Sequence, residues 1–227
     1  MPTMHTIRSR HSVRQYENRP VEGETLRSIE KMIETARESS GLDIQLIQNN
    51  PEAFNVFASF GLIKGARTLI AFVADGRTQD RAIGYWGQRL VLELQDLGLN
   101  TCWAAIFSKR KCRAKVAGGK SIRVVIALGY GTTNGHDRPT KDANQVSRVE
   151  ADYAPEWFSQ VVEAAQLAPT GMNRQDFTVV LKPDGRSIEV ECSGTGLSSI
   201  DAGIVMANIE VAANEEAADW SFSRPCA

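Results

Sequence analysis

The sequence has few of the residues that build metal sites or covalent frameworks. Its 227 residues include four cysteines and three histidines, and no two cysteines form a Cys-x-x-Cys pair. Zinc sites are recognised by cysteines and histidines paired at short spacing, so we expect no metal centre. Unpaired cysteines are typical of a reducing compartment, which predicts a cytoplasmic protein with free thiols.

Aromatic residues are also scarce, at 7% of the sequence, and neither charge sign dominates, because the formal net charge is −1. A nucleic-acid-binding domain shows a broad basic face or an aromatic stacking platform, so we expect no nucleic-acid partner. The longest apolar runs, such as residues 68–74, are far shorter than the roughly 20 residues of a membrane span. With no secretory signal before the first basic residues, we expect no membrane association.

The remaining composition is that of a globular protein, with 42% hydrophobic and 23% charged residues. Against it, residues 7–16 are unusual, because three arginines, a histidine and two serines fall within residues 8–14. Guanidinium groups and hydroxyls are the groups that bind a phosphate monoester. Such a cluster is also compatible with a solvated surface or with non-specific nucleic-acid binding, so the cluster alone does not decide between them.

Hydrophobic periodicity predicts alternating helices and strands along the chain. We expect helices over residues 26–40, 83–97, 156–168 and 202–213, and strands over residues 68–74, 122–128, 177–181 and 187–191. Residues 42–66 show no clear period and are predicted to be a loop with short helical pieces, in which Phe54, Phe57 and Phe60 could share a face. Residues 132–146 are polar and predict a linker or long loop.

The predicted elements suggest an internal repeat. A first part, residues 1–146, and a second part, residues 147–227, each contain a helix, a strand and a further helix leading to a tryptophan, Trp103 or Trp220. The fold class expected is α+β, with a mixed, mainly antiparallel sheet flanked by helices and two related halves packed as one globular unit.

Four stretches, taken in order, resemble motifs of the FMN-dependent nitroreductase family. Residues 10–14, Arg-His-Ser-Val-Arg, are similar to the N-terminal FMN motif of that family. Residues 84–103 are similar to its central helix and the Gly-Leu-Gly-Thr-Cys-Trp end, and residues 127–131 with Arg138 to its last strand and phosphate arginine. Residues 164–175 are similar to its Ala-Pro-Ser-x-x-Asn-x-Gln segment.

The resemblance implies a nitroreductase-like fold and an FMN site. Its cofactor-binding residues would come from four stretches: Arg10, His11, Ser12 and Arg14; Ala105 and Ile106; Arg138 and Lys141; and Pro169, Thr170, Gly171 and Asn173. Arg10 and Arg138 would meet the phosphate, and Arg14 the flavin N1 and C2 carbonyl, where a cation raises the reduction potential. Ala105 and Ile106 stand near flavin N5, where the family often has glycine.

One departure from the family pattern implies an internal duplication. In the family dimer, the Asn-x-Gln segment lies in the first part of each chain and reaches the partner's flavin, whereas here it occurs only at residues 169–175. The chain is thus similar to the monomeric, dimer-mimicking nitroreductases. The second part has no Arg-His-Ser-x-Arg motif, which predicts a monomer with one FMN.

The expected activity is hydride transfer from NADH or NADPH, through flavin N5, to a nitroaromatic, a quinone or a similar small acceptor. No catalytic residue of the protein is required, because the cofactor carries the chemistry. The alternatives are a flavin-binding sensor or storage protein without turnover, and an N-terminal nucleic-acid module that binds no flavin.

Overall fold

A computed structural model describes residues 1–54 and 61–224 of the chain. It divides into two compact units. Unit 1 consists of Met1–Ser9, Asp80–Arg89 and Arg138–Ala227, and unit 2 of Arg10–Gln79 and Leu90–Asp137. Helix α4 (Asp80–Asp96) therefore starts in unit 1 and ends in unit 2. Within the described residues, no helix is both long enough and apolar enough to span a bilayer.

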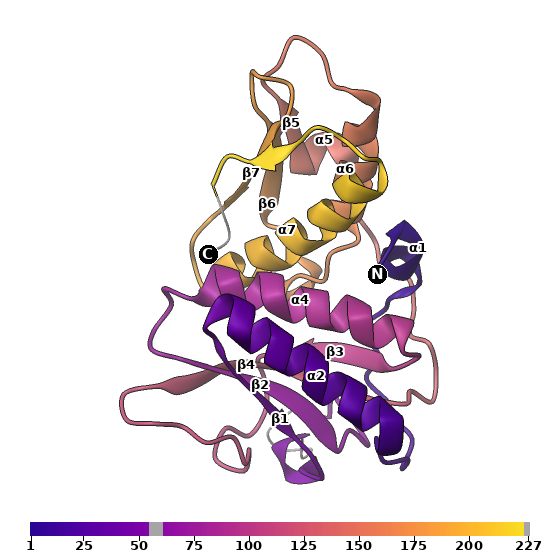
Figure 1. Cartoon of the computed structure of the whole chain (residues 1–227), viewed down its shortest axis with the longest axis vertical. Helices are drawn as coiled ribbons and strands as arrows, with labels where there is room; N and C mark the ends of the chain where they lie inside the picture. Colours follow the sequence, from indigo (N-terminus) through magenta and orange to yellow (C-terminus); the bar gives the residue numbers. More distant parts are fainter. Residues whose placement is uncertain (55–60, 225–227) are drawn as a thin grey trace. The chain divides into compact units, whose positions relative to one another are not determined.

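Unit 2 is built on an antiparallel sheet with the strand order β1–β2–β4–β3 (Figure 1). The strands are β1 (Asp43–Ile47), β2 (Thr68–Ala74), β3 (Asn100–Ala104) and β4 (Ser121–Gly129). Helix α2 (Gly23–Ser40) contacts β1 and ends at Gly41, which adopts the left-handed conformation that glycine favours. A short 3-10 helix, η1 (Pro51–Phe54), follows β1.

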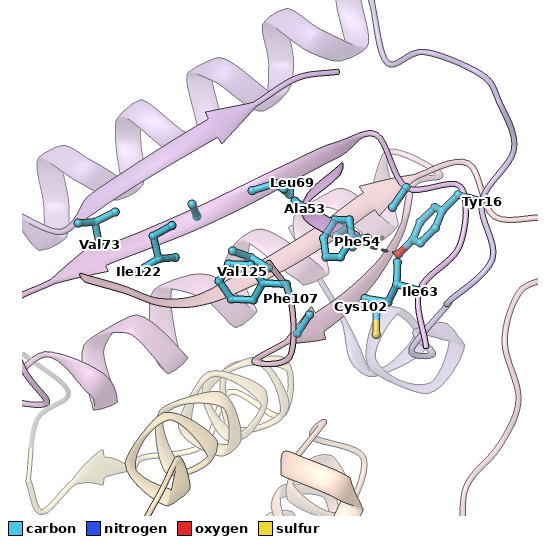
Figure 2. Packing of buried hydrophobic residues seen from close by; sticks show 14 residues of the cluster. Tyr16, Ala53, Phe54, Ile63, Leu69, Val73, Cys102, Phe107, Ile122 and Val125 are labelled. Carbon is cyan, nitrogen blue, oxygen red and sulfur yellow. Dashed lines mark hydrogen bonds between the residues drawn. The ribbon is translucent and has the colours of Figure 1, made fainter. Parts of the chain in front are cut away.

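One face of this sheet carries a compact apolar core. Figure 2 shows Leu69, Val73, Ile122 and Val125 together with the ring of Phe107. The cluster also takes in Tyr16, whose hydroxyl donates a hydrogen bond to the Ala127 carbonyl oxygen at 3.3 Å. Burial raises the pKa of Tyr16 well above its ordinary value, so this phenol stays protonated and anchors residues 10–16 to the core.

Unit 1 has a mixed sheet with the strand order β5–β6–β7–β8. Its strands are β5 (Ser147–Val149), β6 (Phe177–Leu181), β7 (Ser187–Cys192) and β8 (Ser221–Phe222). The β6–β7 pair is antiparallel, and the outer pairs, β5–β6 and β7–β8, are parallel. Helices α1 (Met4–Ser9), α5 (Ala143–Val146), α6 (Glu156–Gln166) and α7 (Ser198–Glu215) complete the unit.

Within unit 1, α7 and the first residues of α4 cross with their backbones in contact. A Cβ atom on Gly203 would lie 2.0 Å from the Arg81 carbonyl oxygen, and one on Gly84 would lie 2.0 Å from that of Ile200. No side chain fits at either position, so both helices require glycine at the crossing. Each glycine meets the residue three positions before the other, so the crossing is locally two-fold symmetric.

A buried hydrogen-bond network continues from this crossing. The Gln88 amide donates to Asn208 Oδ1 at 2.9 Å, and the Asn208 amide donates to the Ala164 carbonyl oxygen at 2.9 Å. Gln88 and Asn208 are both fully buried. Because each amide has a partner, the network ties α4, α7 and α6 together without leaving these donors unsatisfied.

Most elements expected from the sequence are confirmed, and three corrections follow. Residues 42–66 are not only loop, because residues 43–47 form the edge strand β1 paired with β2. Residues 100–104 form β3, which the periodicity did not reveal. Residues 132–146 are not only linker, because residues 143–146 form the short helix α5. Phe54 is buried, whereas Phe57 and Phe60 lie outside the described residues.

Candidate functional site

In unit 2, residues 10–16 form an extended segment bonded to three other parts of the sheet unit. The Val13 amide donates to the Thr101 carbonyl oxygen at 3.0 Å, and the Tyr16 amide donates to that of Lys64 at 3.0 Å. The Gln15 carbonyl oxygen accepts from the Thr132 amide at 2.9 Å. Because the contacts come from β3, from residue 64 and from the end of β4, the segment has little conformational freedom.

Glycines allow this close approach. A Cβ atom on Gly131 would lie 2.7 Å from Val13 Cγ1, one on Gly135 2.6 Å from His11 Cβ, and one on Gly65 2.3 Å from the Tyr16 carbonyl oxygen. The Gly129-Tyr130-Gly131 motif is thus explained by packing against residues 13–16.

The polar side chains of this segment differ in their exposure to solvent. Arg10 is 5% exposed, His11 and Ser12 are half-buried, and Arg14 is exposed. Burial raises the pKa of the nearby Cys102 thiol, and the positive charges of Arg14 and Arg10 act against that rise. The Cys102 thiol is thus held protonated, and the segment carries the positive field of two guanidinium groups.

Asp137 is an acidic neighbour of the segment. His11 Nε2 is 3.9 Å from the carboxylate of Asp137, whose side chain is fully exposed. At this distance and exposure the contact is weak.

Ala105 and Ile106 directly follow β3 in unit 2. Both are exposed, and Ile106 is among the large apolar side chains that the unit leaves in solvent. The next residue, Phe107, is buried in the core of Figure 2. A rigid strand on one side and a buried ring on the other therefore hold this short peptide at the surface.

The other predicted site residues lie together in unit 1. Arg138 Nη2 donates to the carbonyl oxygens of Leu167 and Ala168 at 2.8 and 2.6 Å. The Lys141 amide and Nζ donate to Oε1 and the carbonyl oxygen of Gln175, at 3.0 and 2.9 Å. Arg138 thus stabilises the C-terminal end of α6, where carbonyls lack helical partners, and Lys141 fixes Gln175.

The segment containing Pro169, Thr170, Gly171 and Asn173 has an unusual backbone. Three non-glycine residues adopt positive φ, at 52° for Met172, 55° for Asn173 and 48° for Gln175. Gln175 is 2% exposed, while Met172, at the tip, is 87% exposed. Left-handed non-glycine residues persist only where their surroundings hold them, and they concentrate at functional sites.

Side chains supply the contacts that hold this segment. The Asn173 amide donates to the Pro139 carbonyl oxygen at 2.8 Å, and Thr170 Oγ1 accepts from the Gln175 amide at 3.0 Å. Asn173 therefore has an internal partner for the amide that the family resemblance assigns to the flavin. Lys141 and Gln175 also line an open polar pocket of about 310 Å³ beside β6 and β7.

Sequence reasoning missed Asp201, in the first turn of α7. Both its carboxylate oxygens are 3.0 Å from the Gly171 amide nitrogen, which donates to them. Burial raises the pKa of Asp201 to about 6, the Gly171 hydrogen bond acts against that rise, and the charge of Asp176 adds to it. No local motif marks this residue, because the contact joins positions thirty residues apart.

The donor chemistry of residues 10–14 fits a phosphate-bearing cofactor such as FMN, because a buried guanidinium, an imidazole and a hydroxyl come from one rigid segment. Within unit 1, the donors of Arg138, Lys141 and Asn173 bind neighbouring backbone. The roles that the resemblance assigns to these three residues stay predictions.

Comparison with known proteins gives two kinds of match. A family model described as "Putative TM nitroreductase" matches residues 2–213. Among solved structures, a "putative nitroreductase" from Thermotoga maritima has 20% identity and a TM-score of 0.72, covering 95% of this chain and 85% of its own. A second such protein, from Desulfovibrio desulfuricans and in complex with FMN, has 21% identity and a TM-score of 0.51, covering 64% of this chain and 95% of its own. No curated protein sequence matches the chain.

Proposed function

Because the chain belongs to the nitroreductase family defined by that model, we propose that it is an FMN-dependent oxidoreductase. Its electron donor is NADH or NADPH, and its acceptor is a small organic molecule such as a nitroaromatic or a quinone. The observation that carries the proposal is the segment of residues 10–14, where a buried arginine and its polar neighbours are held in one conformation. The FMN complex of the Desulfovibrio desulfuricans protein supports the choice of cofactor.

Each residue of this segment has a role that follows from its chemistry. Bound FMN would supply the redox chemistry, namely hydride acceptance from the nicotinamide and electron delivery to the acceptor. Arg10 pairs with the phosphate, and His11 and Ser12 bind the phosphate and ribityl oxygens. Arg14 brings a positive charge to the pyrimidine edge of the ring, and the exposed Ala105–Ile106 peptide borders the reacting face.

The residues of unit 1 complete the assignment. Arg138 and Lys141 hold the backbone around residues 167–175. The contacts with the flavin ring that the resemblance assigns to Pro169, Thr170, Gly171 and Asn173 are part of the same proposal. Asp201 accepts a hydrogen bond from the Gly171 amide. It therefore acts on the site by positioning this segment.

We also propose that the chain arose by internal duplication. The order α2, β1, β2, α4, β3 matches the order α6, β6, β7, α7, β8. In both sets, the first two strands pair antiparallel. Strands β2 and β3 both run antiparallel to β4 and thus parallel to each other, as β7 and β8 do. The second set differs by lacking a strand equivalent to β4 in its described residues.

The crossing of Gly84 and Gly203 supports the same origin. Its local two-fold symmetry is that expected of an isologous interface between two copies of one element, here α4 and α7. In the first part, Gly129 and Gly131 at the end of β4 pack against residues 13–16. Without an equivalent of β4, the described residues of the second part have no such support for a second cofactor-binding segment. We therefore propose one FMN for each chain, and a monomer, with the halves at residues 1–146 and 147–227.

The decisive experiment is spectroscopic. Protein purified without added flavin is expected to show the absorption of bound FMN near its visible maxima, and anaerobic addition of NADH or NADPH is expected to bleach it. Retained colour with no bleaching by either nucleotide would favour a flavin-binding sensor or storage protein. Protein that neither carries nor takes up FMN would refute both functions.

A further inference from the structure

A segment of unit 2 that has no role in the proposed flavin site is strongly basic. Residues 109–120 contain six cations and no acidic residue, in a chain whose net charge is −1. All six are exposed. We define the basic ridge as five of them: Lys109, Arg110, Lys111, Arg113 and Lys115.

The central part of the basic ridge has the alternation of a β-strand. Cys112 and Ala114 pack against the apolar core, while Lys111, Arg113 and Lys115 are exposed. Alternate residues of an extended chain point to the same side and are about 7 Å apart. This exposure pattern leaves three cations on the solvent side of one short segment, which is suited to several phosphate groups rather than to a single carboxylate.

Two amide side chains fix the backbone of this row. The Asn50 amide donates to the Lys111 carbonyl oxygen at 3.0 Å, and Asn50 Oδ1 accepts from the Arg113 amide at 2.8 Å. Gln45, on β1, bonds in the same way to Lys115, at 2.8 and 2.7 Å. Asn50 is fully buried. The cations thus stand on a backbone held in place by the sheet.

The charges of the basic ridge remain available for an external anion. In the described ranges, no carboxylate lies within ion-pair distance of these five side chains. The pKa of Glu52 is affected by two of these charges. Hydrogen bonds from its own backbone and from Asn50 lower the pKa of Glu52, and the charges of Arg113 and Lys111 lower it further.

The basic ridge begins close to the expected reacting face. Lys109 is three residues beyond Ile106 and Lys111 is five beyond it, so an extended chain places their backbones at most about 11 and 18 Å away. Cations at that range attract the phosphates of an incoming nucleotide, since clustered charge raises local ligand concentration and on-rate.

We propose that the basic ridge binds the phosphate groups of the electron donor and makes the protein select NADPH over NADH. This inference rests on the proposed function, which supplies the need for a nicotinamide donor. The two donors differ only in the 2′-phosphate, so three cations on a fixed backbone discriminate between them by charge. Neutral acceptors such as quinones carry no phosphate, so the basic ridge does not strengthen their binding.

The test uses the flavin-loaded protein and a triple variant, Lys111→Gln/Arg113→Gln/Lys115→Gln. A matched control, Arg27→Gln/Lys31→Gln/Arg37→Gln, removes three exposed cations of the same unit that all lie on α2. Two quantities are measured for each protein: kcat/KM with NADPH and NADH, and binding of 2′,5′-ADP and 5′-AMP by calorimetry. Calorimetry reports on the basic ridge without any turnover.

The wild-type protein is expected to bind 2′,5′-ADP more tightly than 5′-AMP. The triple variant is expected to lose that difference and at least about tenfold of kcat/KM with NADPH, but less than about threefold with NADH. The control is expected to match the wild type. An equal loss with both donors, or unchanged 2′,5′-ADP binding in the triple variant, would overturn the proposal.

Two further outcomes separate this proposal from others. Binding of a single-stranded oligonucleotide that depends on the three cations, with NADPH kinetics unchanged, would overturn it and assign the basic ridge to nucleic acid. If neither donor bleaches the wild-type flavin while 2′,5′-ADP binds in the expected way, the proposed function fails and the phosphate site stands.

Discussion

At the scale of single residues, the proposed function makes Arg10 the main determinant of FMN affinity. Its guanidinium is buried, and losing a charge-assisted contact between such a group and a phosphate costs about 2–4 kcal/mol, or roughly 30- to 1,000-fold in Kd. We expect that loss for Arg10→Ala in a fluorescence titration with FMN. Arg27→Ala, on α2, is the control and should bind normally. Unchanged affinity in a folded Arg10→Ala protein would remove Arg10 from the site.

Arg14 has a different task, because it is exposed and its charge is assigned to the flavin ring. A cation beside N1 stabilises the reduced, anionic ring. Arg14→Ala is therefore expected to lower the flavin reduction potential while weakening FMN binding less than Arg10→Ala does. Anaerobic redox titration against reference dyes measures the change, and Arg14→Lys should restore much of it. An unaltered potential would exclude the assignment to N1.

Asp201 makes the stability of the protein depend on pH. Its pKa is raised to about 6 in the folded state, so between pH 4 and 6 the folded protein binds more of this proton than the unfolded chain. The contribution of Asp201 to the free energy of unfolding therefore falls as the pH rises through that window. Above pH 6 the full cost of burying its charged carboxylate applies. Asp201→Asn keeps an acceptor for the Gly171 amide and removes the charge.

We expect Asp201→Asn to raise the free energy of unfolding at pH 8 by about 1–3 kcal/mol, and to leave it nearly unchanged at pH 4. Urea denaturation at the two pH values measures the difference. Asp152→Asn, at an exposed position, is the control and should have little effect at either pH. A gain of the same size at both pH values would show that ionisation of Asp201 is not the cause.

At the scale of elements, the contact between α4 and α7 depends on glycine. A methyl group on Gly203 would lie 2.0 Å from a carbonyl oxygen of α4, and backbone atoms cannot move aside as a flexible side chain can. Gly203→Ala is expected to cost about 3 kcal/mol or more, measured from the denaturant midpoint. Gly118→Ala faces open space and should be close to neutral. Equal stability of the two variants would contradict the close crossing.

At the scale of the whole molecule, the proposed duplication predicts the stoichiometry. The Arg-His-Ser-x-Arg motif of residues 10–14 occurs once in the sequence. The second set of elements also has no strand equivalent to β4 in its described residues. A phosphate buried without cations would cost several kcal/mol. We expect one FMN per chain from absorbance ratios and a monomer by sedimentation. Two flavins per chain, or a tight dimer, would refute the duplication argument.

The sequence by itself determined the elements whose signals are local. Residues 68–74 and 122–128 are mostly apolar, with one polar residue each. The helix ending at Gly41 is stopped by the one residue that adopts left-handed φ without cost. The motif at residues 10–14 left a phosphate site, a solvated surface and a nucleic-acid contact open when taken alone, and it indicated the family only together with the three later stretches. The same local signals were sufficient for the family.

Only the tertiary structure decided the features that depend on contacts between distant residues. Strand β1 is short, and its place at the sheet edge follows from pairing with β2, which begins twenty-five residues later. A hydrophobic period within residues 43–47 carries no information on that pairing. Asp201 acquires its role from Gly171, and Gly203 from Arg81, through contacts that exist only after packing. Burial, close approach and pKa are properties of neighbours in space, so the chain order alone could not give them.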